Sequence, residues 1–216
     1  MVVFTVIFGD LAGIASGGVP YALFSLAALV PWTFFATSML LGSDSLVANA
    51  DLVSKIYFPR IFIPAGVVAA GLVDLAVSTT ILTIIVLVWG YVPGVAVLLL
   101  PLLIAIAVAT ALGLTAALSA INVRFRDVRY VVPFAIQLGL FASPVAYSSS
   151  ELAEPWQTLF ALNPLVGVIE GFRWAFLGTP AAPWDLIAVS AGSALLILAA
   201  GLAYFDRVER SFADYV

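Results

Sequence analysis

Residues 61–89 read IFIPAGVVAAGLVDLAVSTTILTIIVLVW, an apolar run in which Asp74 is the only charged residue. An α-helix needs about 20 consecutive apolar residues to cross the hydrocarbon core of a bilayer. The run is longer than that, and it is continuous where a transmembrane barrel would show short segments of alternating polarity. The stretch therefore predicts a transmembrane helix and an all-α integral membrane protein.

The composition of the whole chain supports this fold class. Of its 216 residues, 64% are hydrophobic and 9% are charged, whereas ordinary soluble domains are roughly 45–50% apolar and about 25% charged. A water-soluble enzyme is excluded on that ground. The chain has no cysteine and no histidine, so disulfides are excluded and the commonest general base and metal ligand is absent. We expect one membrane domain over residues 1–216, with no catalytic site, no metal and no nucleic-acid partner.

Further long apolar runs cover residues 20–43, 95–121, 130–147 and 186–205. Together with 61–89 they predict five full spans. Residues Met1–Gly9 form an apolar stub that is too short to cross a membrane, and we interpret it as the end of a helix whose beginning is missing. Small residues near the start of the run at 61–89 favour close helix packing there: Ala65, Gly66, Ala69, Ala70 and Gly71.

Basic residues predict the orientation, because Lys and Arg in short loops are retained on the cytoplasmic side. If five spans alternate, seven of the eight basic residues fall on one side. One loop holds Lys55 and Arg60, a second loop holds Arg124, Arg126 and Arg129, and the C-terminal tail holds Arg207 and Arg210. The C-terminus is therefore expected in the cytoplasm.

The segment 148–183 is too apolar for a solvated loop and too interrupted by proline for a span. Glu154-Pro155 indicates a helix start, Asn163-Pro164 a stop and restart, and Gly178 a C-terminal cap. We expect two short re-entrant helices in the outer leaflet. Their aromatic residues are expected at the interface, either as part of a functional site or as a simple aromatic belt: Trp156, Phe160, Phe172, Trp174, Phe176 and Trp184.

Asp74 is the one acid deep inside a long span. A charge there costs about 2.5–3.5 kcal/mol on insertion scales, so the side chain is expected to face protein, water or a partner. Two interpretations stay open. Asp74 is a proton or ion site, or it bonds Ser78, Thr79 or another helix as structural glue.

The loop at 49–60 mixes bases with aromatic residues, and Asn49 or Asp51 can cap a short amphipathic helix that ends before Pro59. Such a helix suits docking of a cytoplasmic partner, whereas anchoring to anionic lipid is the simpler alternative. The phosphate-binding pattern G-x-x-x-x-G-K-[ST] is absent. The chain is therefore not expected to bind ATP in the usual way by itself.

Five motifs, in order along nearly the whole chain, resemble the membrane subunits of type-2 ABC exporters, in particular the group that exports O-antigen, capsular polysaccharide and teichoic acid. They are Pro20-Tyr21 with Trp32-x-Phe34-Phe35, Asn49-x-x-Leu52-Val53-x-Lys55 followed by Phe58-Pro59-Arg60, Arg126-Asp127-Val128, Ser143-Pro144-Val145-x-Tyr147, and Leu162-Asn163-Pro164 followed by Glu170-Gly171-Phe172-Arg173. The sequence departs from the family at its N-terminus, where the amphipathic helix and the start of the first span are missing.

The resemblance implies a permease subunit of the bacterial inner membrane, working as a homodimer that moves a lipid-linked glycan. ATP and Mg²⁺ would bind to a separate cytoplasmic ATPase. The implied ATPase-coupling residues are Asn49, Leu52, Lys55, Ile56, Tyr57, Phe58, Pro59, Arg60, Arg124, Arg126 and Asp127. The implied outer gate and translocation path contain Tyr21, Trp32, Phe35, Tyr147, Trp156, Phe160, Asn163, Pro164, Glu170 and Arg173.

Other functions stay open from the sequence. A type-2 exporter of drugs or other lipids shares the same architecture. A secondary transporter would show internal repeats, paired midplane charges or broken helices, and a membrane glycosyltransferase would show a cluster of exposed carboxylates. The sequence displays neither pattern.

Overall fold

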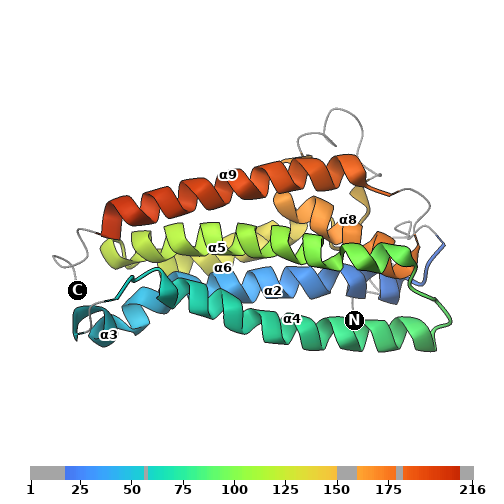
Figure 1. Cartoon of the computed structure of the whole chain (residues 1–216), viewed down its shortest axis with the longest axis horizontal. Coiled ribbons are helices and arrows are strands. Elements are labelled where there is room, and N and C mark those ends of the chain that lie inside the picture. The colour runs from blue at the N-terminus through green and yellow to red at the C-terminus, as the bar shows by residue number, and fades with distance from the viewer. Residues whose placement is uncertain (1–17, 56–57, 150–159, 179–181, 210–216) are drawn as a thin grey trace.

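The computed structural model describes residues 18–55, 58–149, 160–178 and 182–209. These residues form a bundle of helices lying side by side along one long axis (Figure 1). The elements, in chain order, are α2 (Tyr21–Ala48), α3 (Ala50–Lys55), α4 (Phe62–Val88), η2 (Val95–Leu99), α5 (Leu100–Arg124), α6 (Val128–Phe141), α8 (Pro164–Leu177) and α9 (Trp184–Glu209).

Four of the predicted spans are confirmed as helices long and apolar enough to cross a membrane. They are Tyr21–Ala48, Phe62–Val88, Val95–Arg124 and Trp184–Glu209, with 26 to 30 residues each. At a rise of about 1.5 Å per residue each exceeds the hydrocarbon thickness of about 30 Å. The fold is therefore that of an all-helical, multi-pass membrane protein.

The apolar run 130–147 is not one helix, which corrects the bounds predicted for that span. Helix α6 has 14 residues and ends at Phe141, so it is about 21 Å long. The chain then turns at 142–147, where Pro144 has no N–H to continue a helix. Val145 and Ala146 of this turn are buried in protein, whereas Ala142 is exposed. The count of five spans stays a prediction.

Helices α5 and α9 approach each other closely at two glycines. A Cβ atom added to Gly201 would lie 2.0 Å from the carbonyl oxygen of Gly113, and one added to Gly113 would lie 2.7 Å from Cα of Leu198. Only glycine permits the two backbones to approach so closely. Of the small residues predicted for this task on α4, Gly71 packs closely on α2, where an added Cβ would lie 3.2 Å from Ser38 Oγ and 3.3 Å from Phe34 Cε2. Gly66 has open space beside it, and Ala69 and Ala70 are exposed.

Helix α8 begins and ends where the sequence predicts. The side chain of Asn163 accepts a hydrogen bond from the Leu165 N–H at 3.1 Å, and Gly178 closes the helix in the left-handed conformation at φ +66°. The helix is buried against α9, α2 and α5. Its rings Phe172 and Phe176 are 0% and 1% exposed, so the expectation that these two lie at a membrane interface is wrong. The preceding helix start, at 154–155, lies outside the described residues.

The two ends of the bundle differ in their content of Lys and Arg. Figure 1 shows α3, the link between α5 and α6, and the last turn of α9 at one end, with α8 toward the other. We call the end at which α3 lies the basic end, because it holds the following basic residues: Lys55, Arg60, Arg124, Arg126, Arg129 and Arg207. Arg210 lies outside the described residues.

Candidate functional site

Helix α3 projects from the basic end as a short exposed element (Figure 1). Asp51 and Lys55 form an exposed ion pair along it, with Nζ to Oδ1 at 2.9 Å, a contact that contributes only about 0.3–0.5 kcal/mol on a helix surface. Leu52 is 41% exposed. The side chain of Asn49 donates to the carbonyl of Ser45 at 2.8 Å, so it closes α2 rather than capping α3. Ile56 and Tyr57 lie outside the described residues.

The loop after α3 is attached to the far end of the chain. The backbone N–H of Arg60 donates to Oε1 of Glu209 at 3.1 Å, and Nη1 of Arg60 donates to the Glu209 carbonyl oxygen at 2.8 Å. This carbonyl lies in the last turn of α9, where helices leave carbonyls without intrahelical partners. Phe58 is half-buried and Pro59 exposed beside this contact.

The second predicted coupling segment joins α5 to α6. Arg124, Arg126 and Asp127 are all exposed there, and the guanidinium of Arg124 lies 5.2 Å from the ring centroid of Phe125. Just before it, the side chain of Asn122 donates to the Ser43 carbonyl and to Asp44 Oδ1, each at 3.1 Å. Asn122 thus fixes α5 to α2 beneath the loop, a task that the sequence did not reveal.

Arg173 is fully buried inside the protomer, at 0% exposure. Its Nη2 donates to the Val145 carbonyl at 2.9 Å, its Nη1 to the Tyr147 carbonyl at 3.1 Å, and its Nε to the Phe24 carbonyl at 3.3 Å. Its guanidinium carbon lies 3.5 Å from the centroid of the Phe24 ring. The side chain therefore supplies donors to carbonyls that the turn after α6 leaves without helical partners.

Other predicted gate residues complete the same turn. Glu170 Oε1 accepts from Arg173 Nη1 at 3.3 Å and from the Ser149 N–H at 2.8 Å. The Tyr21 hydroxyl donates to the Ala146 carbonyl at 2.7 Å. Asn163 Nδ2 donates to the Ala142 carbonyl and to Ser143 Oγ, each at 3.0 Å. We call residues 142–149, together with the side chains of Tyr21, Asn163, Glu170 and Arg173, the clamped turn.

Irregular backbone at membrane depth is tolerated only where it is buried in protein or lines a cavity, because lipid cannot satisfy its polar groups. The clamped turn meets that condition through side chains from α2, α8 and the residue before α8. Motifs that lie far apart in the sequence thus converge on one turn. Within the described chain their shared task is structural, and their predicted role in a gate or path stays a prediction.

The remaining predicted path residues are placed as follows. Trp32 and Phe35 are buried, with ring centroids 5.7 Å apart, and Trp32 packs against Gly139 of α6. Phe160 is half-buried, and its ring centroid lies 5.9 Å from that of Tyr147. Pro164 is buried at the start of α8. Trp156 lies outside the described residues.

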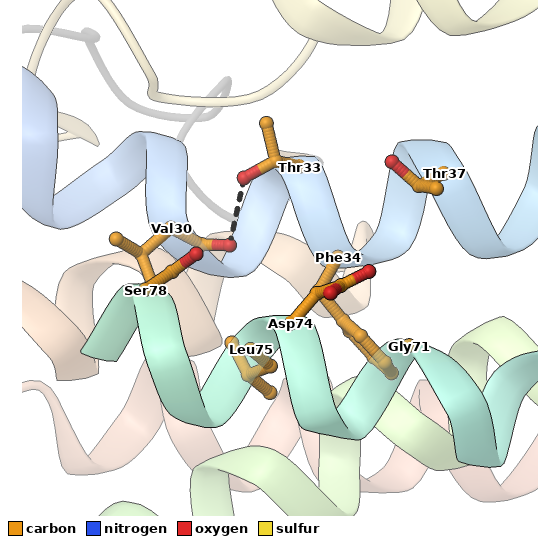
Figure 2. Close-up of a pocket in the computed structure, with 8 residues that line it drawn as sticks. All are labelled: Val30, Thr33, Phe34, Thr37, Gly71, Asp74, Leu75 and Ser78. Atoms are coloured by element: carbon orange, nitrogen blue, oxygen red, sulfur yellow. Dashed lines mark hydrogen bonds between the residues drawn. The ribbon is translucent and has the colours of Figure 1, made fainter. Parts of the chain in front are cut away.

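Asp74 lines a groove between α2 and α4 that also contains Thr33, Thr37 and Ser78 (Figure 2). This polar part has a volume of about 60 Å³, and it continues into a more apolar part of about 240 Å³ that shares Val30, Thr33 and Ser78. Asp74 is exposed in the protomer and has no hydrogen bond or ion pair within the described part of the chain. The structural-glue interpretation through Ser78 or Thr79 therefore has no support here.

Sequence reasoning missed Thr33 and Thr37. The signal was present, because Thr33 and Thr37 are four residues apart, as are Asp74 and Ser78. Residues at that spacing share one face of a helix. What the sequence could not show is that these two faces meet.

Comparison with known proteins identifies the family. A family model described as "ABC-2 type transporter" matches residues 1–177. The chain is 31% identical over 200 residues to the O-antigen export system permease protein RfbA of Myxococcus xanthus, covering 91% of this chain and 76% of that protein. It is 27% and 29% identical over 196 residues to two Klebsiella pneumoniae proteins of the same name, covering 90% of this chain and 75% of each. The chain belongs to the ABC-2 type transporter family.

Proposed function

We propose that this chain is the permease subunit of an ATP-driven exporter that moves a lipid-linked, O-antigen-type polysaccharide across the bacterial inner membrane. The observation that carries the proposal is the similarity, over nine-tenths of the chain, to relatives named as O-antigen export permeases. The four long apolar helices supply the membrane domain that such a subunit needs.

In this proposal the chain itself performs no covalent chemistry. ATP and Mg²⁺ bind to a separate ATPase, which docks at the basic end. Helix α3 is the docking element, because it projects with Leu52 41% exposed. The Arg124–Asp127 segment is a second contact, since its side chains are likewise exposed.

The basic end is cytoplasmic in this proposal, and α8 lies toward the outside. Support comes from the gathering of Lys55, Arg60, Arg124 and Arg207 at one end of the bundle (Figure 1). Lys and Arg near the ends of spans are retained in the cytoplasm during insertion.

Two copies of the chain enclose the path. Tyr21, Trp32, Phe35 and Arg173 are each no more than 7% exposed within one protomer, so their side chains are already packed and leave no opening between them. A glycan is a wide cargo, and a passage for it is better supplied by surfaces of two facing copies.

The test is to remove the chain from a host that makes the glycan. Loss of surface polysaccharide with lipid-linked glycan retained inside, restored by the wild-type chain and its ATPase, supports the proposal. Normal surface glycan in the deletion strain overturns it. Export of drugs or other lipids, with glycan unaffected, favours the other type-2 exporters, and transport that continues without ATP favours a secondary transporter.

A further inference from the structure

The groove between α2 and α4 is lined by Asp74, the only charged side chain of α4, together with three residues that carry hydroxyl groups. Figure 2 shows the Asp74 carboxylate and the Ser78 hydroxyl extending from α4 toward α2, whose Thr33 and Thr37 also line the groove but lie on the side of α2 farther from α4 in this view. Asp74 is the thirteenth residue of a 27-residue helix, so the groove lies near the middle of the span.

The groove differs from the rest of the exposed surface of α4. Val73 and Val77, the residues immediately before Asp74 and Ser78, are 66% and 55% exposed, and Ile84 is 56% exposed. These side chains form an exposed apolar surface of the kind that suits contact with lipid. The polar residues occupy the adjacent strip of the same helix.

The polar groups of the groove are not satisfied within the described chain. Asp74, Thr37 and Ser78 have no hydrogen-bond partner there, and Thr33 is bonded only to carbonyls of its own helix. Neither α2 nor α4 contains a lysine or arginine, and Arg173 is committed to the clamped turn. Lipid offers no donor to a carboxylate, and a charge at this depth costs about 2.5–3.5 kcal/mol on insertion scales.

The set of groups indicates which ligand would satisfy it. An ionised carboxylate accepts hydrogen bonds and cannot donate them, whereas threonine and serine hydroxyls both donate and accept. Neighbouring hydroxyls of a sugar match this arrangement, because they donate to the carboxylate and exchange hydrogen bonds with the side-chain hydroxyls. An apolar helix does not match it.

We propose that the α2–α4 groove faces the aqueous transport path of the assembled exporter and that Asp74, Thr37 and Ser78 bind hydroxyl groups of the glycan during its passage. The inference rests on the proposed function. It deepens that function by placing a cargo-binding surface on a strip of α4 that a single protomer leaves exposed.

The first experiment measures water access, and the chain suits it because it has no native cysteine. Thr37→Cys and Ser78→Cys are introduced singly into the full transporter with its ATPase, with Val77→Cys as the matched control. Each is treated with a membrane-impermeant, cationic methanethiosulfonate, which reacts with thiolate and therefore requires water. We expect the groove cysteines to react about tenfold faster or more than the control.

The second experiment asks whether the cargo is the ligand. In cells that accumulate the lipid-linked glycan because the ATPase is inactive, reaction at Thr37→Cys should slow relative to cells that make no glycan. Separately, Asp74→Leu should reduce export about tenfold, the effect of losing roughly 1.4 kcal/mol, while Asp74→Asn retains more activity and both bind the ATPase normally.

Groove cysteines as unreactive as Val77→Cys, reaction unaffected by glycan, or full export by Asp74→Leu each overturn the inference. Lack of reaction together with cross-linking of Ser78→Cys to another helix identifies a protein contact in its place. If the wild-type chain exports no glycan, the proposed function itself is wrong. If only the groove inference is wrong, the wild-type chain still exports glycan.

Discussion

Arg60 and Glu209, separated by 149 positions in the sequence, are joined by two hydrogen bonds at the basic end of the bundle. Arg60 stands just before α4, and Glu209 ends α9. The loop that follows the proposed docking helix is therefore attached to a helix that reaches α8, where Ser190 Oγ accepts from the Gly167 N–H at 3.0 Å. A displacement of the docking loop would act directly on α9.

The first prediction tests that attachment. Glu209→Ala removes the acceptor for the Arg60 N–H and should lower export per ATP hydrolysed by about fivefold, corresponding to the roughly 1 kcal/mol typical of one hydrogen bond. Glu209→Gln keeps Oε1 as an acceptor and serves as the matched control. Export and ATPase activity are measured in the same vesicles, and equal ratios for Ala, Gln and wild type would show that the contact carries no coupling.

The second prediction concerns Arg173. Arg173→Ala removes the donor from the buried Val145 carbonyl and from the partly buried Tyr147 carbonyl, and a buried acceptor left unpaired costs about 1–3 kcal/mol. The protein should therefore accumulate poorly and lose thermal stability in detergent. Arg173→Lys should not rescue it, because an ammonium lacks the planar fork that reaches several acceptors at once. Arg126→Ala, at an exposed site, is the control. A stable Arg173→Ala protein that only fails to export would favour the path role over the clamp.

The third prediction uses the contact between α5 and α9. Gly201→Ala places a methyl group 2.0 Å from the Gly113 carbonyl oxygen, so the helices must separate, and such overpacking typically costs about 1–3 kcal/mol. Gly192→Ala on the same helix has open space beside it and should be neutral or stabilising, by up to about 1 kcal/mol. Thermal unfolding in detergent compares the two, and equal effects would contradict the packing argument.

The fourth prediction concerns docking of the ATPase. Leu52→Ala with Ile56→Ala removes apolar side chains at helical spacing from the loop at 49–60, and an interface centred on them should weaken at least tenfold. Co-purification of the ATPase measures the loss. Lys55→Ala, which removes only an exposed ion pair, should bind nearly normally. Wild-type assembly and export by the stably inserted double mutant would leave lipid anchoring as the role of this loop.

The fifth prediction fixes the orientation. Phe125→Cys at the basic end should react with a membrane-impermeant thiol reagent only from the cytoplasmic side, and Leu162→Cys before α8 only from outside. These positions are 55% and 59% exposed. Ser149, by contrast, is 7% exposed and would report poorly. Reaction of both cysteines from the same side would contradict the proposed topology.

Much of the fold followed from composition and local chemistry. Long apolar runs predicted the four apolar helices, because a helix satisfies its own backbone in lipid. The start and end of α8 followed from Asn163-Pro164 and Gly178, since capping depends on a few adjacent residues. The exposed short helix α3 was likewise foreseeable from the residues around Asp51.

Only part of the candidate site could be predicted from the sequence. The motifs around Tyr21, Val145, Asn163 and Arg173 were recognisable one by one, but their convergence on the clamped turn was not. An arginine in a gate and an arginine buried beneath a turn look alike in a sequence, because each needs only polar partners. Which partners are present depends on how α2, α6 and α8 pack.

The sequence by itself determined that this protein is a helical membrane protein, and its ordered motifs indicated the exporter family, because apolar length and local patterns are properties of contiguous residues. Tertiary structure alone decided that Gly113 meets Gly201 and that Asp74 and Thr37 line the same groove. Each of these depends on contacts between residues dozens of positions apart. Burial and close approach are properties of packed pairs, and a linear pattern does not record which faces meet.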